Sequence, residues 1–466
     1  MKKPNLNESF ISRLWLDNKY YDNLKTTDGK PVEVISYGKL NTDSGADFKD
    51  ALIKIGDKVF EGDVEIHKTF KDWENHKHSL DGKYNKVILH VIFWDDKSNT
   101  LNKTVNKLLE EIPTVILSRF LLDSIHNIWK DIINNPLPSF KLPCSSYTKT
   151  INDTFKKNFL KKQGLTRLSF RSERIRNRKK ELDIEYIETP DLVWKKLLFE
   201  FSCESLGFSK NKEQFLKFSK NLDFKFLAAQ KYSIKTLEGL FFGAAGFLKD
   251  IKIDDEYIFS LKKNWAKLNQ SLNQTVMDIS DWVFFRLRPN NFPTLRLAYA
   301  ASLCFEILYN NFFENVITFF NTDNINVDKL VRLLMKINPS SYWNNHYHLG
   351  KSSNKNLNPL GKTRSLEIII NVFLPLLFLY SKLSENQTLY NKVVNFYLSL
   401  KYVENNSIIR IMKKQLNIKI NSAIEAQGII HLHNNLCVRQ LCHKCDIGKQ
   451  VFTNDKVSEV LKIILY

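Results

Sequence analysis

Two acidic residues and a histidine near the N-terminus have the types and the spacing of a catalytic metal site. Asp47 stands at the start of a predicted strand, and Glu65 and His67 stand two residues apart on the next one. Because residues two apart on a strand project from the same face, Glu65 and His67 share a face. If the two strands pair as a hairpin, Asp47 approaches Glu65. Paired carboxylates favour Mg²⁺ or Mn²⁺, and His67 beside them could act on a water that attacks a phosphodiester.

The elements that must position these side chains are predicted by the surrounding sequence. Residues 31–37 have the pattern of a strand, as do residues 51–55 and 58–67, which a Gly-Asp turn joins into a hairpin. Apolar residues at helical spacing predict a helix over about residues 10–20. The β-branched run 87–93 predicts a buried strand behind the hairpin.

This arrangement resembles the core of the PD-(D/E)XK nucleases, in which a helix and a strand precede a strand opened by Asp and a strand bearing Glu-x-Lys. Asp47 stands in the place of that Asp, and Glu65 and His67 stand where the pattern has Glu and Lys. The resemblance implies a restriction-endonuclease-like mixed sheet, with Asp47 and Glu65 holding the cation and Glu33 as a weaker candidate ligand. His67 departs from the pattern, because a neutral imidazole has no permanent positive charge.

More histidines follow His67. His76 and His78 lie two apart in a short polar stretch, and His90 lies within the predicted buried strand. We expect His76 and His78 to support the cation's ligands, to contact the phosphates of a nucleic acid, or to form a separate Zn²⁺ site. His90 alone is equally well explained as a hydrogen-bonded residue of the core.

Longer stretches of the chain are similar to an uncharacterised bacterial family known only as a domain of unknown function. The similarity is carried by residues 39–48, 62–67, 72–78, 84–91, 206–212, 238–248, 288–297 and 370–375 and by the cysteine-containing tail. It implies one architecture for almost the whole chain and brings no activity with it.

Arginines gather on one predicted helix. Four of them follow the i, i+4, i+7, i+11 spacing of a single helix face: Arg167, Arg171, Arg174 and Arg178. Such a face could follow a phosphate backbone by charge alone, although a run of charge is as often a solvated helix surface. Arg288, with Arg286 and Arg296 on either side of it, flanks a loop that enters a helix near Pro293, which makes a second candidate phosphate contact.

Cysteines near the C-terminus have metal-ligand spacing. Three of them form a Cys-x4-Cys-x2-Cys pattern: Cys437, Cys442 and Cys445. This pattern predicts a Zn²⁺ site whose fourth ligand is His433 first, with His431 and His443 behind it. The alternative is an iron–sulfur cluster that takes its fourth thiolate from the distant Cys144.

Composition favours a nucleic-acid partner. The chain has 466 residues with 43% hydrophobic and 26% charged residues, an ordinary globular composition. Its net charge is +19, and such an excess favours a polyanionic partner, a nucleic acid first and an anionic membrane surface second. The N-terminus lacks the apolar stretch of a secretion signal, and the longest apolar run, 368–380, is too short to span a bilayer. We therefore expect a cytoplasmic protein without a membrane segment.

The sequence thus predicts an α+β fold in three parts. Residues 1–150 form a nuclease-like domain with a mixed sheet, residues 151–420 a basic and mainly α-helical domain, and residues 421–466 a metal-binding tail. Helical spacing of apolar residues is expected from about residue 101, starting with the stretch 105–134.

The predicted function is metal-dependent hydrolysis of phosphodiester bonds in DNA, with RNA as the second substrate. One alternative is a nucleic-acid binder that keeps the nuclease fold and has lost catalysis, since His67 replaces the lysine. Another is a Zn²⁺ enzyme on a different substrate, built on His67, His76, His78 and His90.

Overall fold

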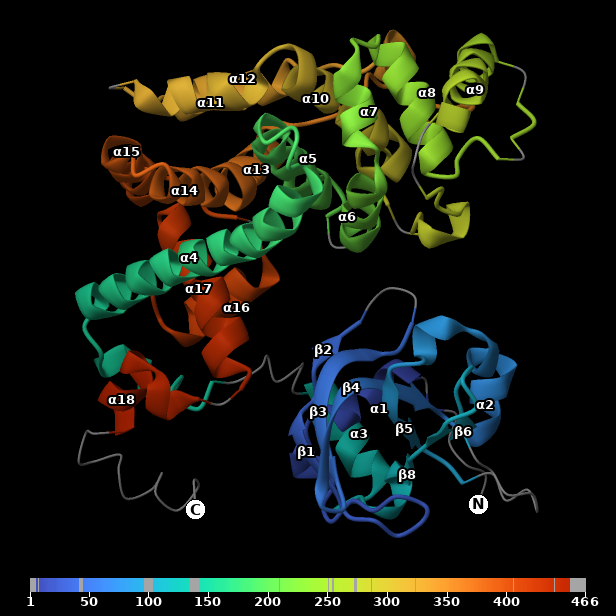
Figure 1. Cartoon of the computed structure of the whole chain (residues 1–466). Coiled ribbons are helices and arrows are strands. Elements are labelled where there is room, and N and C mark those ends of the chain that lie inside the picture. The colour runs from blue at the N-terminus through green and yellow to red at the C-terminus, as the bar shows by residue number, and fades with distance from the viewer. Residues whose placement is uncertain are drawn as a thin grey trace. The chain divides into compact units, whose positions relative to one another are not determined.

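The chain folds into two compact units. In the computed structural model, unit 1 comprises Met1–Pro143 with Val438–Leu441, and unit 2 comprises Cys144–Cys437 with Cys442–Tyr466. Unit 1 is built on a mixed sheet and unit 2 is mainly helical (Figure 1), which confirms the α+β class and the order of the two parts. The structure describes residues 6, 8–41, 45–95, 104–134, 142–208, 210–249, 251–253, 255–271, 275–285, 287–322, 324–404, 406–439 and 441–452.

The sheet of unit 1 has strand order β1-β3-β4-β5-β8, with β2 paired to β3. Its strands are β1 (Val32–Ser36), β2 (Lys39–Leu40), β3 (Phe48–Ile55), β4 (Lys58–His67), β5 (Val87–Ile92) and β8 (Thr114–Ile116). The predicted hairpin is confirmed, because β3 and β4 pair antiparallel around Gly56, whose φ of 60° suits a tight turn. β5 then pairs parallel with β4, and β8 parallel with β5.

One face of this sheet is apolar. Helices α1 (Glu8–Trp15) and α3 (Ile125–Asn134) contribute side chains to a core that also contains Val64 and Ile66 of β4 and Leu89 of β5. Since successive side chains of a strand point to opposite faces, the residues between these positions lie on the other side of the sheet.

That second face is covered by the segment between β4 and β5. It consists of α2 (Phe70–Asn75) and two 3₁₀ turns, η2 (His78–Leu80) and η3 (Gly82–Tyr84). Trp73 and Tyr84 are buried in a small apolar cluster of their own and anchor the segment. The polar residues of β4 and β5 are thereby shielded from solvent by α2 and the turns.

The apolar spacing of residues 105–134 predicted a helix over the whole stretch, and this prediction is wrong. The stretch begins with the short pair β6 (Thr104–Val105) and β7 (Glu111–Ile112), continues with β8, and becomes helical only in α3. A short apolar run fits a buried strand as well as a helix. Here the β-branched residues 114–116 pair with β5, so the sheet gains a strand that the sequence interpretation had missed.

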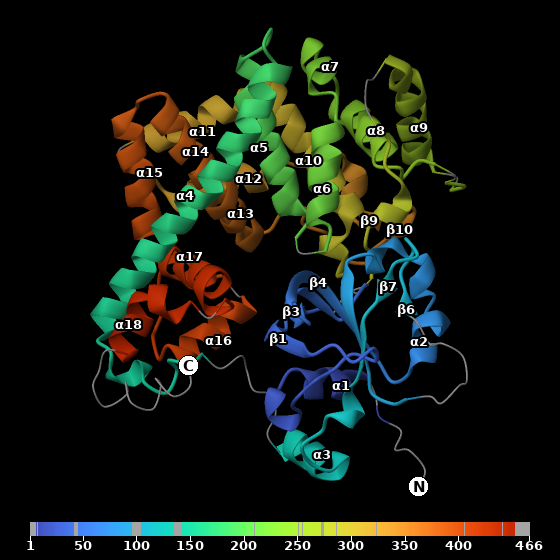
Figure 2. The same ribbon diagram turned by 60° about the horizontal axis from the view of Figure 1, so that its bottom comes forward.

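Unit 2 is built around the long helix α4 (Asp153–Glu185) (Figure 2). The helices that follow are α5 (Asp191–Leu206), α6 (Lys212–Asn221), α7 (Phe224–Ala229), α8 (Ile234–Ala244), α9 (Glu256–Leu268), α10 (Pro293–Tyr309), α11 (Phe312–Asn321), α12 (Val327–Met335), α13 (Lys362–Ile368), α14 (Leu374–Leu383), α15 (Gln387–Ser399), α16 (Ser407–Gln415), α17 (Ala423–Leu432) and α18 (Asp446–Phe452), with a small hairpin of β9 (His346–His348) and β10 (Lys351–Ser352). α4 and α17 approach closely at Gly164 and Gly428, where an added Cβ would lie 2.3 Å from the carbonyl oxygen of Ile424 and 2.0 Å from that of Leu160.

One stretch of unit 2 is long and apolar enough to cross a membrane by length and composition. It is the continuous helical stretch Lys362–Leu383, and 72% of its most apolar window is buried inside the protein. Such burial is also found in core helices of globular domains, so the stretch does not by itself indicate a membrane segment.

Candidate metal centre

A row of polar side chains crosses the three parallel strands of unit 1. In the parallel register Glu65 of β4 lies opposite His90 of β5, and His90 lies opposite Thr114 of β8. All three residues are buried, and His67 follows Glu65 on the same face of β4. The sheet therefore presents a carboxylate and two imidazoles to the segment that covers this face.

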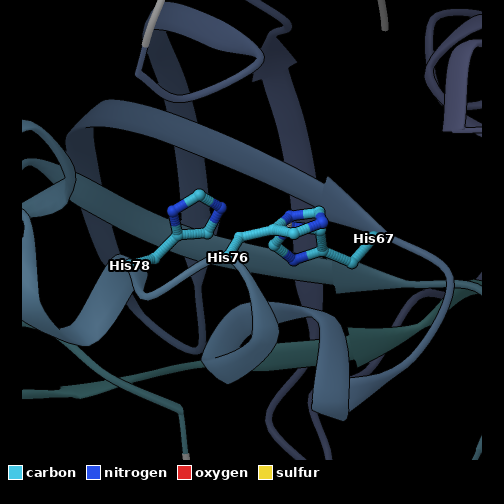
Figure 3. A group of neighbouring side chains, drawn as sticks. All are labelled: His67, His76 and His78. Carbon is cyan, nitrogen blue, oxygen red and sulfur yellow. Dashed lines mark hydrogen bonds between the residues drawn. The ribbon is translucent and has the colours of Figure 1, made fainter.

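The covering segment adds two more imidazoles. Helix α2 ends at Asn75 with His76 as its C-cap, and the next residue, Lys77, takes a left-handed conformation with a φ of 59°. This turn lets His76 and His78 both point back toward His67 (Figure 3). Tyr84 stacks on the ring of His78 with 3.7 Å between ring centroids, which fixes its orientation.

Four potential ligand atoms converge at this point. The Nε2 atom of His67 lies 3.1 Å from Nδ1 of His76 and 3.4 Å from Oε1 of Glu65. The same Oε1 lies 3.3 Å from Nε2 of His78. A tetrahedral ion with bonds of about 2.0–2.1 Å separates its ligands by roughly 3.3–3.4 Å. These three spacings are compatible with ligands of one ion and equally with direct hydrogen bonds or ion pairs between the side chains.

The protonation state of the imidazoles suits a cation. Burial lowers the pKa of His67 to about 3 and also lowers the pKa of His78, so both rings are neutral near neutral pH. Nε2 of His78 is buried without a hydrogen-bond partner, which is costly unless another group satisfies it. Neutral imidazole is the form that binds metal ions. His76 is exposed, so the site opens to solvent on its side.

A chain of hydrogen bonds orients His67 from behind. Nδ1 of His67 lies 3.0 Å from Nε2 of His90, whose Nδ1 lies 2.8 Å from the hydroxyl of Thr104. The Thr104 and Thr114 hydroxyls are 3.3 Å apart, and that of Thr114 donates to the carbonyl oxygen of Ile112. The Thr114 hydroxyl donates its proton to the carbonyl oxygen of Ile112, so it accepts its second hydrogen bond from the Thr104 hydroxyl. Thr104 then accepts from Nδ1–H of His90. Nε2 of the neutral His90 ring therefore has no proton and accepts from Nδ1–H of His67. Nε2 of His67 is thus left with a lone pair facing Glu65 and His76.

Asp47 lies directly beside the ligand set. Its backbone N–H donates to Oε2 of Glu65 at 2.8 Å, and its own Oδ2 accepts a hydrogen bond of 3.1 Å from the backbone N–H of Ile66. Burial raises the pKa of both carboxyls, and the charge of Glu65 raises that of Asp47 further. A divalent cation would offset the cost of burying this charge.

The structure thus brings together six of the residues singled out in the sequence, while Glu33 lies elsewhere. The six are Asp47, Glu65, His67, His76, His78 and His90. The side chain of Glu33 is 71% exposed and stands 4.0 Å from Nζ of Lys54, near the opposite end of β3 from Asp47. The sequence interpretation missed Thr104 and Thr114. They lie ten residues apart at the two ends of a mixed polar and apolar stretch, and nothing in the pattern linked them to His90.

The predicted arginine face is occupied by contacts within unit 2. Each guanidinium has a partner: Arg167 with Gln427, Arg171 with the carbonyl oxygen of Asn371, Arg174 with Glu204, and Arg178 with Glu200. Arg296 is buried over the ring of Phe208, and Arg286 lies outside the described residues. Arg288 is exposed at the start of a short 3₁₀ turn. Among the described residues, Arg288 and Arg174 are the proposed phosphate contacts of unit 2 that are exposed, and Arg174 is also paired with Glu204.

The cysteines of the tail all lie in unit 2. Cys437 ends the π-helical turn His433–Cys437, Cys442 begins a 3₁₀ turn, and Cys445 directly precedes α18. Nδ1 of His433 lies 2.8 Å from Oδ1 of Asn434.

Comparison with known proteins gives one match. The family model described as "Protein of unknown function (DUF2851)" matches residues 8–407. It covers the sheet of unit 1 and most of the helices of unit 2, and it ends ahead of the tail cysteines. No curated protein and no solved structure matches the chain.

Proposed function

The chain belongs to the DUF2851 family of proteins of unknown function, and we propose that it is a metal-dependent hydrolase of phosphodiester bonds in DNA, with RNA as the second substrate. The observation that carries this proposal is the convergence of Oε1 of Glu65 on the imidazole nitrogens of His67 and His78 at 3.4 and 3.3 Å, beside an exposed His76. These side chains would hold the cation, and Asp47 lies next to them.

The donor set also indicates which cation is favoured. Three imidazoles and one carboxylate favour a transition metal, so Mn²⁺ is preferred within the Mg²⁺/Mn²⁺ pair and Zn²⁺ is compatible. When bound, such an ion lowers the pKa of a water and polarises a phosphoryl oxygen. His67 would then serve as a ligand, in place of the lysine of the nuclease pattern.

Asp47 is the candidate base. Its carboxyl group is held by Ile66 and its backbone by Glu65, so it stays beside the cation site without being needed as a ligand. It would take the proton of the attacking water, a role for which a carboxyl with a raised pKa is suited. The substrate would approach from the side of the exposed His76.

The order of elements in unit 1 supports a restriction-endonuclease-like interpretation. Helix α1 and strand β1 precede β3, which Asp47 opens, and β4 carries Glu65 and His67. This is the order that the resemblance to PD-(D/E)XK nucleases implies. The net charge of +19 supports a nucleic acid as substrate.

The proposal is tested by incubating the full-length protein with linear and circular duplex DNA, single-stranded DNA and RNA, each with Mg²⁺, Mn²⁺, Zn²⁺ or a chelator. Cleavage is expected with Mn²⁺ and none with the chelator. Asp47→Ala should abolish cutting and spare binding, whereas His126→Ala, which removes an exposed histidine of α3, should change neither. Undiminished cutting by Asp47→Ala would remove that residue from the catalytic role.

A second candidate is a nucleic-acid binder that has lost catalysis. It is favoured by the position of His67, because its Nδ1 faces His90 and its Nε2 faces His76, so β4 offers no cation where a lysine would stand. Binding that weakens steeply with salt, without any metal-dependent product, would support this candidate.

A third candidate is a Zn²⁺ hydrolase of another substrate. The three imidazoles of the centre favour it, since Zn²⁺ commonly takes such ligands. Zn²⁺ bound at His67, His76 and His78 in a protein that cuts none of the four nucleic acids would support it.

A further inference from the structure

We propose that the β9–β10 hairpin of unit 2 binds single-stranded nucleic acid, with a base stacked on His346 and phosphates contacted by Lys351 and Arg288. The inference goes beyond the proposed hydrolysis and does not depend on it, because all three residues belong to unit 2. Unit 1 is close to neutral by its sequence, so almost the whole net charge of +19 lies in unit 2. A polyanion is therefore attracted to unit 2 more strongly than to unit 1.

Three rings form a parallel stack that ends at His346. The rings of Tyr257 and Tyr342 have centroids 4.1 Å apart and planes 14° apart, and those of Tyr342 and His346 have centroids 3.9 Å apart and planes 11° apart. Among the described rings, Tyr342 is the one in contact with His346, which is itself partly exposed. A nucleobase can extend such a stack by one ring, because every base has a π-face.

The stack is fixed by hydrogen bonds to the core of unit 2. The hydroxyl of Tyr257 donates to Oε2 of Glu238 at 2.9 Å and accepts from Nε1 of Trp343 at 2.8 Å, and both of these partners are fully buried. Nδ1 of His346 donates to the carbonyl oxygen of Tyr342 at 2.8 Å, which orients the imidazole. A ring that is held in place before the ligand arrives loses little conformational entropy on binding.

The hairpin adds a lysine to this ring stack. β10 pairs antiparallel with β9, with Ser352 opposite His346 and Lys351 directly before Ser352. Both residues of β10 are exposed. The turn between the strands contains Gly350, whose φ is 69° and whose N–H donates to the hydroxyl of Tyr342 at 2.8 Å. Tyr342 thus fixes the turn as well as the imidazole, so the exposed lysine and the ring belong to one rigid assembly.

A second cation comes from a segment that packs against the hairpin. Arg288 is exposed and directly precedes the 3₁₀ turn Pro289–Asn291. Phe292, which follows this turn, contacts Tyr347 of β9 with 4.8 Å between ring centroids. The carbonyl oxygen of Tyr347 also accepts a hydrogen bond of 2.6 Å from the hydroxyl of the buried Thr294. The turn that follows Arg288 is therefore fixed to the strand with which the lysine-bearing β10 pairs.

This combination of groups favours a single strand over a duplex or a membrane. A base within a duplex is covered on both faces by its neighbours, so an unpaired strand is needed to offer a face to His346. The tip Gly350–Ser352 has no apolar side chain that could enter a bilayer, and lipid headgroups would use the cations alone. The ring therefore selects the single strand, and the cations make its binding sensitive to salt.

The test measures binding by the full-length protein with a chelator present, so that metal-dependent cleavage does not contribute. In fluorescence anisotropy, a labelled single-stranded oligothymidylate should bind more tightly than a duplex of the same length. His346→Ala should weaken binding of the single strand by about 10- to 100-fold, because one stacked base is lost. His346→Phe keeps a ring at this position and should keep the affinity. The control His126→Ala, at an exposed position of unit 1, should leave it unchanged.

The cations are tested by the salt dependence of the same binding. Lys351→Ala and Arg288→Ala should each reduce the slope of log affinity against log salt by about 0.7, the value for one phosphate contact of a single strand. Lys180→Ala, at an exposed position of α4, is the matched control and should keep the wild-type slope.

A second measurement covers variants that do not fold. Photocrosslinking of a thiothymidine oligonucleotide to the wild-type protein, followed by mass spectrometry, should label the peptide 342–352. Crosslinks confined to other peptides, equal affinity for the single strand and the duplex, or wild-type affinity of His346→Ala would overturn the proposal. Binding to phosphatidylserine vesicles that depends on Lys351, without binding of the oligonucleotide, would also overturn it and assign the surface to a membrane.

Discussion

At the scale of residues, the centre of unit 1 depends on which nitrogen of His67 carries its proton. The chain from Ile112 through Thr114, Thr104 and His90 leaves one consistent assignment, in which Nδ1 of His67 donates and Nε2 accepts. Nε2 therefore carries the lone pair, which faces Nδ1 of His76 at 3.1 Å and which a bound cation would take in place of that contact. Ligand preorganisation of this kind commonly raises metal affinity.

Thr104→Val tests this assignment. The substitution keeps the shape of the side chain and removes the acceptor of the His90 N–H, so His90 and then His67 lose their fixed orientation. We expect affinity for Mn²⁺ to fall by about 10- to 100-fold, measured by calorimetric titration. Thr150→Val, at an exposed position of unit 2, should leave the affinity unchanged. Equal affinities for wild type and Thr104→Val would mean that the hydrogen-bonded chain does not orient His67.

At the scale of elements, the ligands depend on how closely β4 lies against β5. Gly62 makes this approach possible, since a Cβ there would lie 2.5 Å from the Cγ2 atom of Ile88 and 2.6 Å from the carbonyl oxygen of Lys86. The same oxygen accepts a hydrogen bond of 2.8 Å from the N–H of Asp63 at the start of the parallel pairing. Gly62 therefore helps to set the position of Glu65 relative to His90, although it contacts neither residue.

Gly62→Ala should separate the two strands locally. Overpacking of this kind costs about 1–3 kcal/mol, so the free energy of unfolding measured with urea should fall by that amount, and Mn²⁺ affinity should fall with it. The matched control is Gly82→Ala, where the nearest atom to an added Cβ is 3.8 Å away, and its stability should stay within about 0.5 kcal/mol of wild type. A wild-type urea midpoint for Gly62→Ala would contradict the argument.

The arginine row of α4 is explained by packing between helices. Arg178 makes hydrogen bonds of 2.7 and 2.8 Å to the carboxylate of Glu200, which is fully buried on α5. The spacing of the arginines predicted their shared face correctly, but a sequence does not show which face of a helix meets a partner. This row therefore stabilises unit 2.

Arg178→Ala should consequently lower stability and spare nucleic-acid binding. The substitution leaves the buried carboxylate of Glu200 with Lys196, whose Nζ lies 3.8 Å away, and removing the two hydrogen bonds from Arg178 should cost about 3 kcal/mol in the free energy of unfolding. Lys180→Ala, at an exposed position on the same helix, is the control and should cost little. If Arg178→Ala instead weakens DNA binding at unchanged stability, the row contacts phosphate after all.

Much of unit 1 could be predicted from its sequence, because period-two alternation and a Gly-Asp turn specify a hairpin locally. The pairing of Asp47 with Glu65 followed from that hairpin. The contribution of residues 104–116 could not be predicted in the same way, because a short apolar run does not distinguish a strand from a helix. The position of His76 and His78 over β4 depends on the left-handed conformation of Lys77. That conformation is uncommon for lysine and could not be predicted from the sequence.

At the scale of the whole molecule, the two units have separate cores. The apolar core of unit 1 involves residues between Ile11 and Ile132, and that of unit 2 involves residues between Leu168 and Ile424. A cation bound between β4 and α2 should therefore stabilise one unit selectively. The free energy of cation binding adds to the free energy of local unfolding of the elements that bind the cation.

Hydrogen–deuterium exchange can detect this selectivity. With Mn²⁺ at about 100 times its dissociation constant, binding contributes about 2.7 kcal/mol, so amides of β4 and β5 that exchange by opening the site should slow by about 100-fold. Amides of α10 in unit 2 should be unaffected, because α10 belongs to the separate core of unit 2. His76→Ala should abolish the effect in β4 and β5. Equal slowing in both units would contradict a single cation site in unit 1.

We propose that Glu65, His67, His76 and His78 together bind one cation. The most direct measurement is an anomalous difference map from crystals of the full-length protein grown with Mn²⁺. We expect one strong peak about 2.0–2.3 Å from Oε1 of Glu65, Nε2 of His67, Nδ1 of His76 and Nε2 of His78, and no such peak in crystals of His76→Ala. A peak held by Asp47 without the histidines, or no peak on this face of the sheet at saturating Mn²⁺, would contradict it.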